Sequence, residues 1–380
     1  MPTEVSLAGV RGLGSSSRIA GLDGLRAVSI ALVPVAHAWP TAGFGGGWDW
    51  LSHYAGNSTL GVTTFFVVSG YLITWLLRQE HEATGTIRLR SFYMRRVLRI
   101  FPAFYTYLLV VAGLRALGWI QTEYGDLAAA GTFFTNYEHY VRGPSNVDYW
   151  FVGHFWTLSL EEQFYLLWPA TLVLAGMRRA PRVAGGIIVL APVVRVATYF
   201  LWPGSRAQLS MMLHTAADPI MFGCMAALWQ GTGSLERTLD RLGSTRWPLV
   251  ASLFLFIVSP WLTAHFQGAY RMTVGMTLDG AAIAFIVLWV VRAQESALTK
   301  ALATPVVRRI GVLSYSLYLW QQLFLTRLNH AWSGVFPLNL LMAYVAAELS
   351  FRLVESPFLR LRSRFQPVRV MAAAAVPLVP

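Results

Sequence analysis

Long apolar stretches alternate with short polar segments along almost the whole chain. Each apolar stretch has about 20 residues, the length at which an α-helix crosses the hydrocarbon core of a bilayer. Residues 126–137 are too short and polar to cross, and we expect a helix or turn there that lies on one face. The pattern predicts an all-α, polytopic membrane fold with about ten transmembrane helices. The predicted spans are residues 20–40, 60–78, 100–119, 155–177, 183–203, 208–230, 247–265, 271–292, 308–328 and 336–355.

Lys and Arg are distributed unequally between the segments that connect these spans. Alternate segments, counted from the N-terminus, hold 22 Lys and Arg residues, and the remaining segments hold 3. Short loops that stay in the cytoplasm carry the excess of positive charge. The distribution therefore predicts cytoplasmic termini and a multi-pass protein of the plasma or inner membrane.

The composition supports a membrane protein and argues against a nucleic-acid-binding one. Of the 380 residues, 55% are hydrophobic and only 13% are charged, whereas soluble domains average about 25% charged residues. The net charge is +12. Because the positive charge lies in short segments on one side, it faces anionic lipid headgroups or an anionic cytoplasmic ligand, and we expect no nucleic acid partner.

The chain is expected to form one membrane domain. Residues 1–20 are rich in Gly and Ser and indicate a disordered tail, residues 21–365 form the transmembrane domain, and residues 366–380 form a low-complexity tail. Cys224 is the only cysteine, which excludes an intrachain disulfide and a Cys-based zinc site. We expect Cys224 to be a packing residue, and no metal or permanently bound cofactor is predicted.

The first span carries two ionisable side chains on one helical face. Arg26 and His37 are eleven residues apart, which is nearly three helical turns and roughly 16 Å along the axis. Ionisable groups are costly in hydrocarbon and usually face the bundle interior. The pair therefore indicates a site, although a signal anchor or a signal peptide ending near Ala36-His37-Ala38 is an alternative.

Two further motifs add charge near the ends of spans. Arg95, Arg96 and Arg99 have the spacing of neighbours on one helix, and such a cluster suits a diphosphate or a 3′-phosphate. Anchoring of the cytoplasmic side is the alternative interpretation.

The fourth span opens with a pair of carboxylates. Glu161 is expected in the same half of the membrane as His37, so the two side chains could meet. Glu162 is expected to be solvated at the interface.

Taken together, these motifs resemble those of the acyltransferase 3 family. The resemblance covers nearly the whole chain, with the motifs in the family's order. Two positions depart from the family pattern, since Thr157 replaces a Ser and Gln321 replaces a His. The motifs are Leu22-Asp-Gly-Leu-Arg26 with His37 after ten intervening residues, Gly61-Val-Thr-Thr-Phe-Phe-Val-Val-Ser69-Gly70-Tyr71, Phe92-Tyr93-Met-Arg95-Arg96-Val-Leu-Arg99-Ile-Phe-Pro102, Trp156-Thr157-Leu-Ser159-Leu-Glu161-Glu162-Gln163-Phe164-Tyr165, and Gly311-Val-Leu-Ser314-Tyr315-Ser316-Leu-Tyr318-Leu-Trp320-Gln321.

The resemblance implies transfer of an acyl group from acyl-CoA to a sugar hydroxyl. The acceptor would be an envelope glycan, a lipid-linked sugar or an antibiotic glycoside, and the lipid bilayer would be the third partner. His37 would be the general base and Glu161 would orient it. Arg26, Arg95, Arg96 and Arg99 would hold the phosphates of CoA, and the pocket would be lined by Asp23, Ser69, Tyr71, Gln163, Tyr165, Tyr315 and Gln321. Glu355 is expected to be a structural partner of the cytoplasmic arginines.

A secondary transporter is the alternative function. Asp218, Asp279 and His214 lie within predicted spans, and His214 and Asp218 have the spacing of neighbours on one helix. Intramembrane charges of this kind can form an ion or proton path, although pairing of Asp279 with Arg195 or another buried arginine would be a purely structural explanation. We see no internal repeat of the transporter type. The histidines near loops and span ends are expected to be solvated: His53, His81, His139, His154 and His330.

Overall fold

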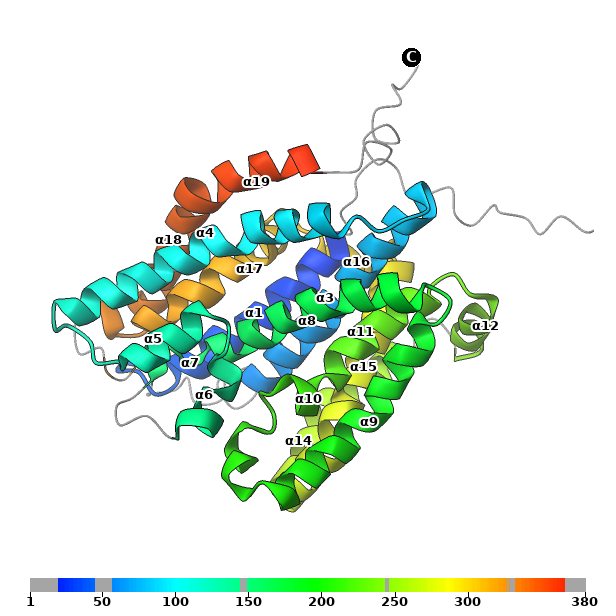
Figure 1. The fold of residues 1–380 in the computed structure, drawn as a ribbon, viewed down its shortest axis with the longest axis horizontal. Coiled ribbons are helices and arrows are strands. Elements are labelled where there is room, and N and C mark those ends of the chain that lie inside the picture. The colour runs from blue at the N-terminus through cyan, green and yellow to red at the C-terminus, as the bar shows by residue number, and fades with distance from the viewer. Residues whose placement is uncertain are drawn as a thin grey trace, which may run out of the picture.

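A computed structural model describes residues 20–44, 57–143, 149–242, 246–326, 328 and 332–365. Within these residues every regular element is a helix and none is a strand, which confirms the all-α fold class. The expected tails lie almost wholly outside the described residues, as do His53 and His330. Figure 1 shows a bundle of helices with α1 in its interior.

Each predicted span coincides with helical structure. The helices at these positions are α1 (Ala20–Ala38), α3 (Ser58–Thr84), α4 (Leu89–Ala116), α8 (Phe155–Ala175), α9 (Ala180–Leu201), α11 (Asp218–Trp229), α13 (Arg246–Leu253) with α14 (Ser259–Tyr270), α15 (Met276–Arg292), α17 (Pro305–Phe324) and α18 (Leu338–Ser350). Shorter helices connect or cover them: α5 (Tyr124–Gly131), α6 (Thr135–Arg142), α7 (Trp150–Gly153), α10 (Leu213–Ala216), α12 (Gly233–Leu242), α16 (Ala297–Leu302) and α19 (Ser356–Arg362).

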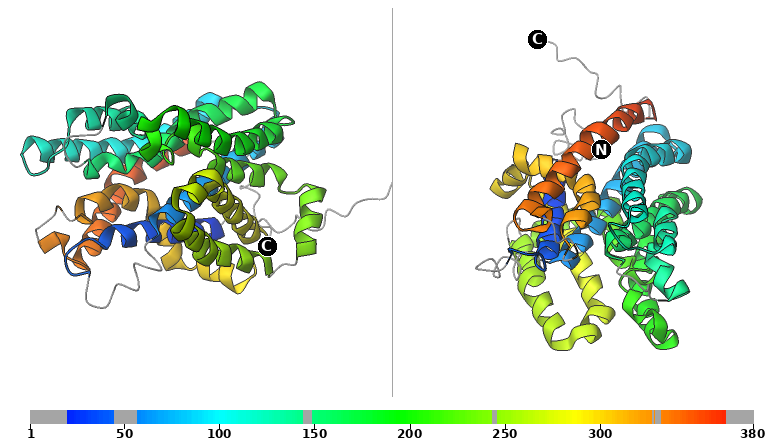
Figure 2. Two further views of the ribbon diagram at one scale, coloured as in Figure 1. Left: turned by 90° about the horizontal axis from the view of Figure 1, so that it is seen from below. Right: turned by 90° about the vertical axis from the view of Figure 1, so that its left-hand side faces the viewer.

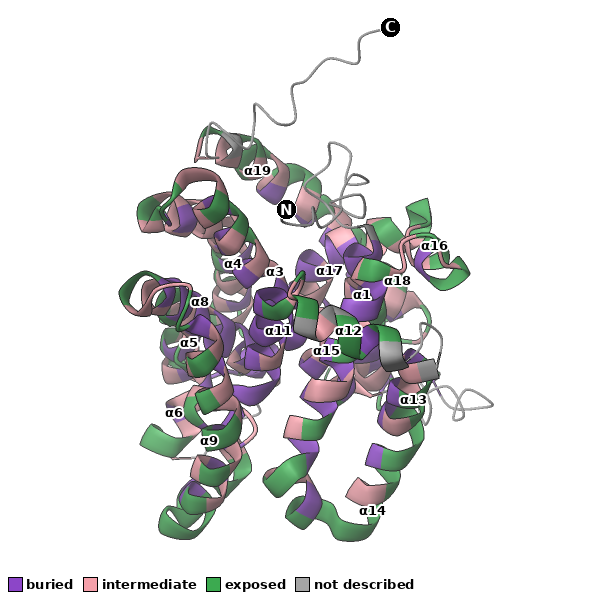
Figure 3. Ribbon diagram, turned by 90° about the vertical axis from the view of Figure 1, so that its right-hand side faces the viewer, coloured by how far each residue is buried: buried purple, intermediate pink, exposed green. Residues whose placement is uncertain are grey.

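Four helical stretches of the described chain are long and apolar enough to cross a membrane: Ser58–Thr84, Leu89–Ala116, Ala180–Leu201 and Trp247–Arg292. The outer helices also expose large apolar side chains, including Leu109, Leu174 and Val189, and Figure 3 shows their exposed outer faces. Such a surface fits a lipid environment. The number of crossings and the orientation of the termini stay predictions.

Three boundaries differ from those expected. The segment from residue 78 to residue 99 is not a loop, because α3 continues to Thr84 and α4 begins at Leu89, with only a short turn at Gly85 (φ +74°) between them. The span at 208–230 is broken, since α10 and α11 are separate helices. The expected loop at 266–271 is a kink at Gln267 (φ 46°, ψ −128°), where the helical chain reverses so that α13 packs against α15. Figure 2 shows this hairpin clearly in its right-hand view.

Close backbone contacts fix helix α1 between α3 and α17. A Cβ atom at Gly311 of α17 would lie 2.0 Å from the Asp23 carbonyl oxygen, and one at Gly61 of α3 would lie 2.6 Å from the Ser29 carbonyl oxygen. The Ser29 hydroxyl donates to the Gly61 carbonyl at 2.6 Å. Because glycine lets backbones approach this closely, α1 cannot slide or rotate relative to its neighbours.

Helix α11 packs against α3 through a similar pair of glycines. A Cβ atom at Gly223 would lie 2.0 Å from the Val67 carbonyl oxygen, and one at Gly70 would lie 2.0 Å from the Ile220 carbonyl oxygen. Cys224, next to this contact, is a fully buried free cysteine, which confirms its expected packing role.

We predict that Gly223→Ala destabilises the protein by about 1–3 kcal/mol, because the added methyl group has to push two helix backbones apart. Thermal unfolding of the detergent-solubilised protein measures the effect. Gly186→Ala is the matched control, since its Cβ atom would meet no atom within 4 Å. Equal melting temperatures for the two variants would show that the contact between α3 and α11 is looser than described.

Candidate functional site

Three arginines from two helices gather at one end of α1. Arg26 of α1 donates to the Ser314 hydroxyl at 2.9 Å and lies over the Phe65 ring at 5.3 Å. Arg96 of α4 lies over the Tyr165 ring at 4.8 Å. Arg99 interacts electrostatically with both of these arginines. We call this region, with Arg26, Arg96 and Arg99, the arginine end.

The structure separates Arg95 from this group. Its guanidinium forms an ion pair with Glu80 at 3.0 Å and donates to the Phe365 carbonyl at 2.8 Å. Arg95 therefore holds α3 and the chain after α19 together. In the part of the chain that the structure describes, no carboxylate forms an ion pair with Arg26, Arg96 or Arg99, although three carboxyl groups lie within electrostatic range of them.

Glu161 lies at the arginine end and not beside His37. The Ser69 hydroxyl and the Tyr165 phenol face its carboxylate, and Arg26 and Arg96 interact with it electrostatically. None of its interactions within the described residues reaches His37. The two predicted catalytic residues are thus apart, because Arg26 and His37 are separated by roughly 16 Å of helix.

Two other carboxylates complete the arginine end. Glu355 accepts a hydrogen bond from Ser316 and interacts with Arg99 and Arg26, which is the structural role expected for it. Glu162 is half-buried and faces Arg96, with one carboxylate oxygen buried and without a hydrogen-bond partner. The expectation that Glu162 is solvated was wrong, because α8 packs against α4 along this edge.

A narrow crevice begins at Glu161 and follows α1. Its volume is only about 30 Å³. Ser29, Ile30 and Val33 line it from α1, on the same helical face as Arg26 and His37. The remaining lining residues come from α3, α8 and α17: Gly61, Val62, Phe65, Phe66, Thr157, Leu158, Glu161, Tyr315 and Tyr318.

His37 lies near the other end of α1, in a region that we call the histidine end. Its ring contacts the Trp150 ring edge-on, with the centroids 5.2 Å apart, and its Nδ1 atom is buried without a hydrogen-bond partner. Gln321 lies beside it within side-chain interaction range. The amide nitrogen and oxygen of Gln321 are also buried and form no hydrogen bond in the described chain. Polar groups of this kind are rare in protein interiors unless a ligand or water satisfies them.

His154 is a residue of the histidine end that the sequence did not indicate. It was expected to be solvated at the end of a span, but it is only 6% exposed. It interacts electrostatically with His37. The expectation was wrong because α7 covers the start of α8, so the end of the apolar stretch is not the surface of the protein.

Comparison with known proteins identifies the family of the chain. The family model described as an acyltransferase domain, that of the acyltransferase 3 family, matches residues 19–349. The chain belongs to the acyltransferase 3 family. It is 28% identical over 369 residues to a candidate O-acetyltransferase of Staphylococcus aureus strain COL, covering 90% of this chain and 57% of that protein. It is also 28% identical to the O-acetyltransferase OatA of Staphylococcus aureus strain NCTC 8325, covering 89% of this chain and 56% of OatA.

The chain thus spans somewhat more than half the length of these relatives. No solved structure matches it.

The remaining predicted pocket residues of this acyltransferase 3 protein divide into two groups. Tyr315 lines the crevice, and its hydroxyl donates to the Ile100 carbonyl at 2.8 Å. Asp23 is buried near Arg26. Tyr71 instead donates to Gln230 at 2.5 Å and fastens α3 to the end of α11. The Gln163 amide bonds Asn136 and the Phe133 carbonyl, so it holds the turn between α5 and α6 on α8.

The charged residues considered for an ion path are paired elsewhere in the bundle. Asp218 accepts from Arg195 at 2.6 Å and from Thr277 at 2.5 Å. Asp279 pairs with Arg271 at 3.2 Å, so its partner is an arginine, as expected, but not Arg195, which pairs with Asp218. His214 meets the Tyr137 hydroxyl at 3.0 Å and does not share a helix with Asp218, because the chain bends between α10 and α11.

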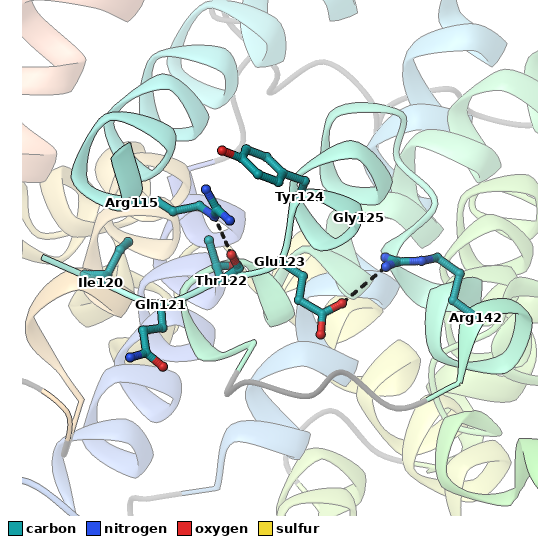
Figure 4. A pocket seen from close by; sticks show the side chains of 8 residues that line it. All are labelled: Arg115, Ile120, Gln121, Thr122, Glu123, Tyr124, Gly125 and Arg142. Carbon is teal, nitrogen blue, oxygen red and sulfur yellow. Dashed lines mark hydrogen bonds and ion pairs between the residues drawn. The ribbon is translucent and has the colours of Figure 1, made fainter. Parts of the chain in front are cut away.

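A second, more open pocket of about 560 Å³ lies between the end of α4 and helices α5 and α6. Figure 4 shows Arg115 beside Tyr124 on one side and Arg142 facing Glu123 on the other. The Arg142 guanidinium also bonds Glu138 at 2.5 Å and lies 3.9 Å from Asp126. His139 adds a third potential metal ligand to these two carboxylates, but Arg142 already supplies positive charge to them.

The buried carboxyl of Glu138 has a perturbed acidity. Burial raises the pKa of Glu138 to about 7, and the neighbouring Asp126 carboxyl adds to this effect, while the Arg142 guanidinium opposes it. A raised pKa means that the folded protein binds more protons than the unfolded chain between about pH 4.5 and pH 7. The contribution of Glu138 to the free energy of unfolding therefore falls as the pH rises through this range.

We predict that Glu138→Gln flattens the dependence of the melting temperature on pH between about pH 5 and pH 7, because the glutamine cannot titrate. Melting temperatures of wild type and variant, measured in one detergent across this range, check it. Glu82→Gln, at an exposed ion pair with Arg78, is the control and should keep the wild-type slope. A Glu138→Gln protein with that same slope would contradict the assignment.

Proposed function

We propose that this protein is a membrane O-acyltransferase that moves an acyl group, acetyl above all, from acyl-CoA to a sugar hydroxyl. The observation that carries the proposal is the crevice along α1. It begins at Glu161 in the arginine end and follows the face of α1 that leads to His37. The protein would act in the cell membrane, with CoA bound at the arginine end and the acceptor at the histidine end.

The arginine end supplies the anion-binding groups that CoA needs. Guanidinium groups bind phosphate through two parallel hydrogen bonds, and they do so best when they are not already paired. Arg26, Arg96 and Arg99 meet this condition within the described chain, whereas Arg95 does not. We therefore assign the first three to the donor and Arg95 to the fold. Glu161 would hold Arg26 and Arg96 in position rather than orient His37.

The length of α1 suits a donor with a long arm. The roughly 16 Å between Arg26 and His37 is within the reach of an extended pantetheine chain. With a volume of about 30 Å³, the crevice has to widen to admit that chain. Its walls are largely apolar side chains, such as Val33 and Phe65, which can move without breaking hydrogen bonds.

The chemistry at His37 is acyl transfer with general base catalysis. His37 accepts the proton of the acceptor hydroxyl as the oxygen attacks the thioester carbon, and it then returns a proton to the departing CoA thiolate. Gln321 lies beside His37 and would position its ring, in place of the histidine of the family pattern. The O-acetyltransferase names of the relatives support acetyl as the acyl group. The resemblance supports an envelope glycan, a lipid-linked sugar or an antibiotic glycoside as the acceptor.

The test is acyl transfer by the purified protein in lipid nanodiscs. Acetyl-CoA is mixed with a panel of glycan fragments, lipid-linked sugars and glycosides, and released CoA is followed with a thiol reagent. The protein adds little background, because its single cysteine is buried. Acceptor-dependent release of CoA and a matching acyl mass on the acceptor are expected. Uptake driven by an ion gradient without release of CoA would establish transport instead.

We predict that His37→Gln lowers kcat at least about 100-fold, because glutamine cannot accept the hydroxyl proton. The measurement is CoA release at saturating donor and acceptor. His265→Gln is the control, since His265 is exposed and the described contacts of its ring are to the carbonyl and the indole of Trp261, on its own helix. Turnover by His37→Gln equal to that of the control would exclude His37 as the base.

We predict that Arg96→Ala raises the KM for acetyl-CoA about tenfold or more, because a charge-assisted contact to phosphate is lost. Arg90→Ala removes an equal charge from an exposed position on the same helix and serves as the control. If the two variants bind acetyl-CoA equally well, the arginines anchor the protein to the lipid surface and do not bind the donor.

A further inference from the structure

The imidazole of His154 is buried and has no hydrogen-bond partner. The side chain lies at the junction of α7 and α8, and both ring nitrogens are enclosed without a partner among the described residues. Aromatic rings surround it, with centroids 4.1 Å away for Phe155, 5.2 Å for Tyr318 and 5.7 Å for Tyr107. A side chain selected only for packing among these rings would not need two polar atoms.

The backbone of His154 is held firmly while its ring is left available. The Tyr318 hydroxyl donates to the His154 carbonyl oxygen, and the Thr157 hydroxyl donates to the same oxygen at 3.3 Å. Tyr318 and Thr157 also line the crevice. The backbone of His154 is therefore fixed next to residues that line the crevice, at its side away from the arginine end, and neither ring nitrogen takes part in these bonds.

His154 and His37 lie within electrostatic range of each other. Apart from the phenols of Tyr107 and Tyr318, His37 is the one titratable group that interacts with the His154 ring within the described chain. The indole nitrogen of Trp320 and the Gln321 amide are buried without partners in the same part of the bundle. Buried polar atoms gathered in this way are rare in native structures, and a catalytic role is one of the reasons for which they are retained.

We propose that His154 is a second catalytic residue, whose N–H group stabilises the charge that develops on the thioester carbonyl oxygen; this rests on the proposed function. A neutral imidazole carries one N–H donor. The acceptor oxygen forms a bond to the carbonyl carbon as its proton passes to His37, and the carbonyl electron pair moves onto the oxygen, which accepts the hydrogen bond of His154. When the carbonyl re-forms, the bond to sulfur breaks and CoA leaves with the proton from His37.

The location of His154 suits this role better than a structural one. A donor that stabilises an oxyanion is most effective when it is fixed beforehand and excluded from water. The aromatic rings exclude water from the His154 imidazole, and the two hydrogen bonds to its carbonyl oxygen fix its backbone. The thioester would arrive along the crevice past Tyr318 and stop between the two imidazoles.

The test compares His154→Phe, His154→Leu and His154→Gln in the acetyl-CoA assay. Loss of the N–H donor should lower kcat about 100- to 1,000-fold, with the KM for donor and acceptor changed less than about threefold. Glutamine keeps an N–H group of similar reach, so His154→Gln should recover at least about tenfold over the Phe variant. His265→Phe is the control, and thermal unfolding identifies any variant that does not fold.

The outcomes separate the two proposals. If wild type transfers the acyl group and a folded Phe or Leu variant keeps wild-type kcat, His154 has no catalytic role. A loss confined to the KM of the acceptor, or a Gln variant no better than the Phe variant, also overturns the assignment. If wild type transfers no acyl group from acetyl-CoA to any acceptor in the panel, it is the proposed function that fails.

Discussion

The fixed position of α1 between α3 and α17 is the constraint on which the site depends. Glycines at the crossings bring backbones into direct contact, so a shift of α1 would create clashes between main-chain atoms. An α-helix is also nearly rigid along its axis, rising about 1.5 Å per residue. Both the arginine end and the histidine end include residues of α1, so the geometry of this one helix sets the distance between them. The two helix crossings hold α1 in place, and no loop is involved.

The polar side chains of the interior serve two different purposes. Arg195 pairs with Asp218 and joins α9 to α11, and Arg271 pairs with Asp279 along one helical stretch. At the two ends of α1, in contrast, the described Arg26, Arg96 and Arg99 form no ion pair with a carboxylate, and several imidazole and amide atoms lack hydrogen bonds. Buried polar groups without hydrogen bonds destabilise a fold. A region in which many such groups lie close together is therefore a candidate binding site, whereas paired groups such as Arg195 and Asp218 form a structural network.

Much of the helical fold could be predicted from the sequence, and so could several of the residues that gather at the two ends of α1. Apolar stretches of the right length located the helices, and the helical period placed Arg26 and His37 on one face. The depth of a residue in the bundle could not be predicted in this way. Glu161 and His154 both lie near the start of an apolar stretch, but tertiary packing carries Glu161 to the arginine end and covers His154 with α7. The pairing of Arg195 with Asp218 likewise depends on packing between helices.

The narrowness of the crevice also bears on what can move along α1. A crevice of about 30 Å³ lined mainly by apolar side chains offers no continuous file of water beside this helix, and hydrated ions do not enter such a space. A bundle built on this plan could let a small uncharged group move beside α1 while it stays closed to hydrated ions.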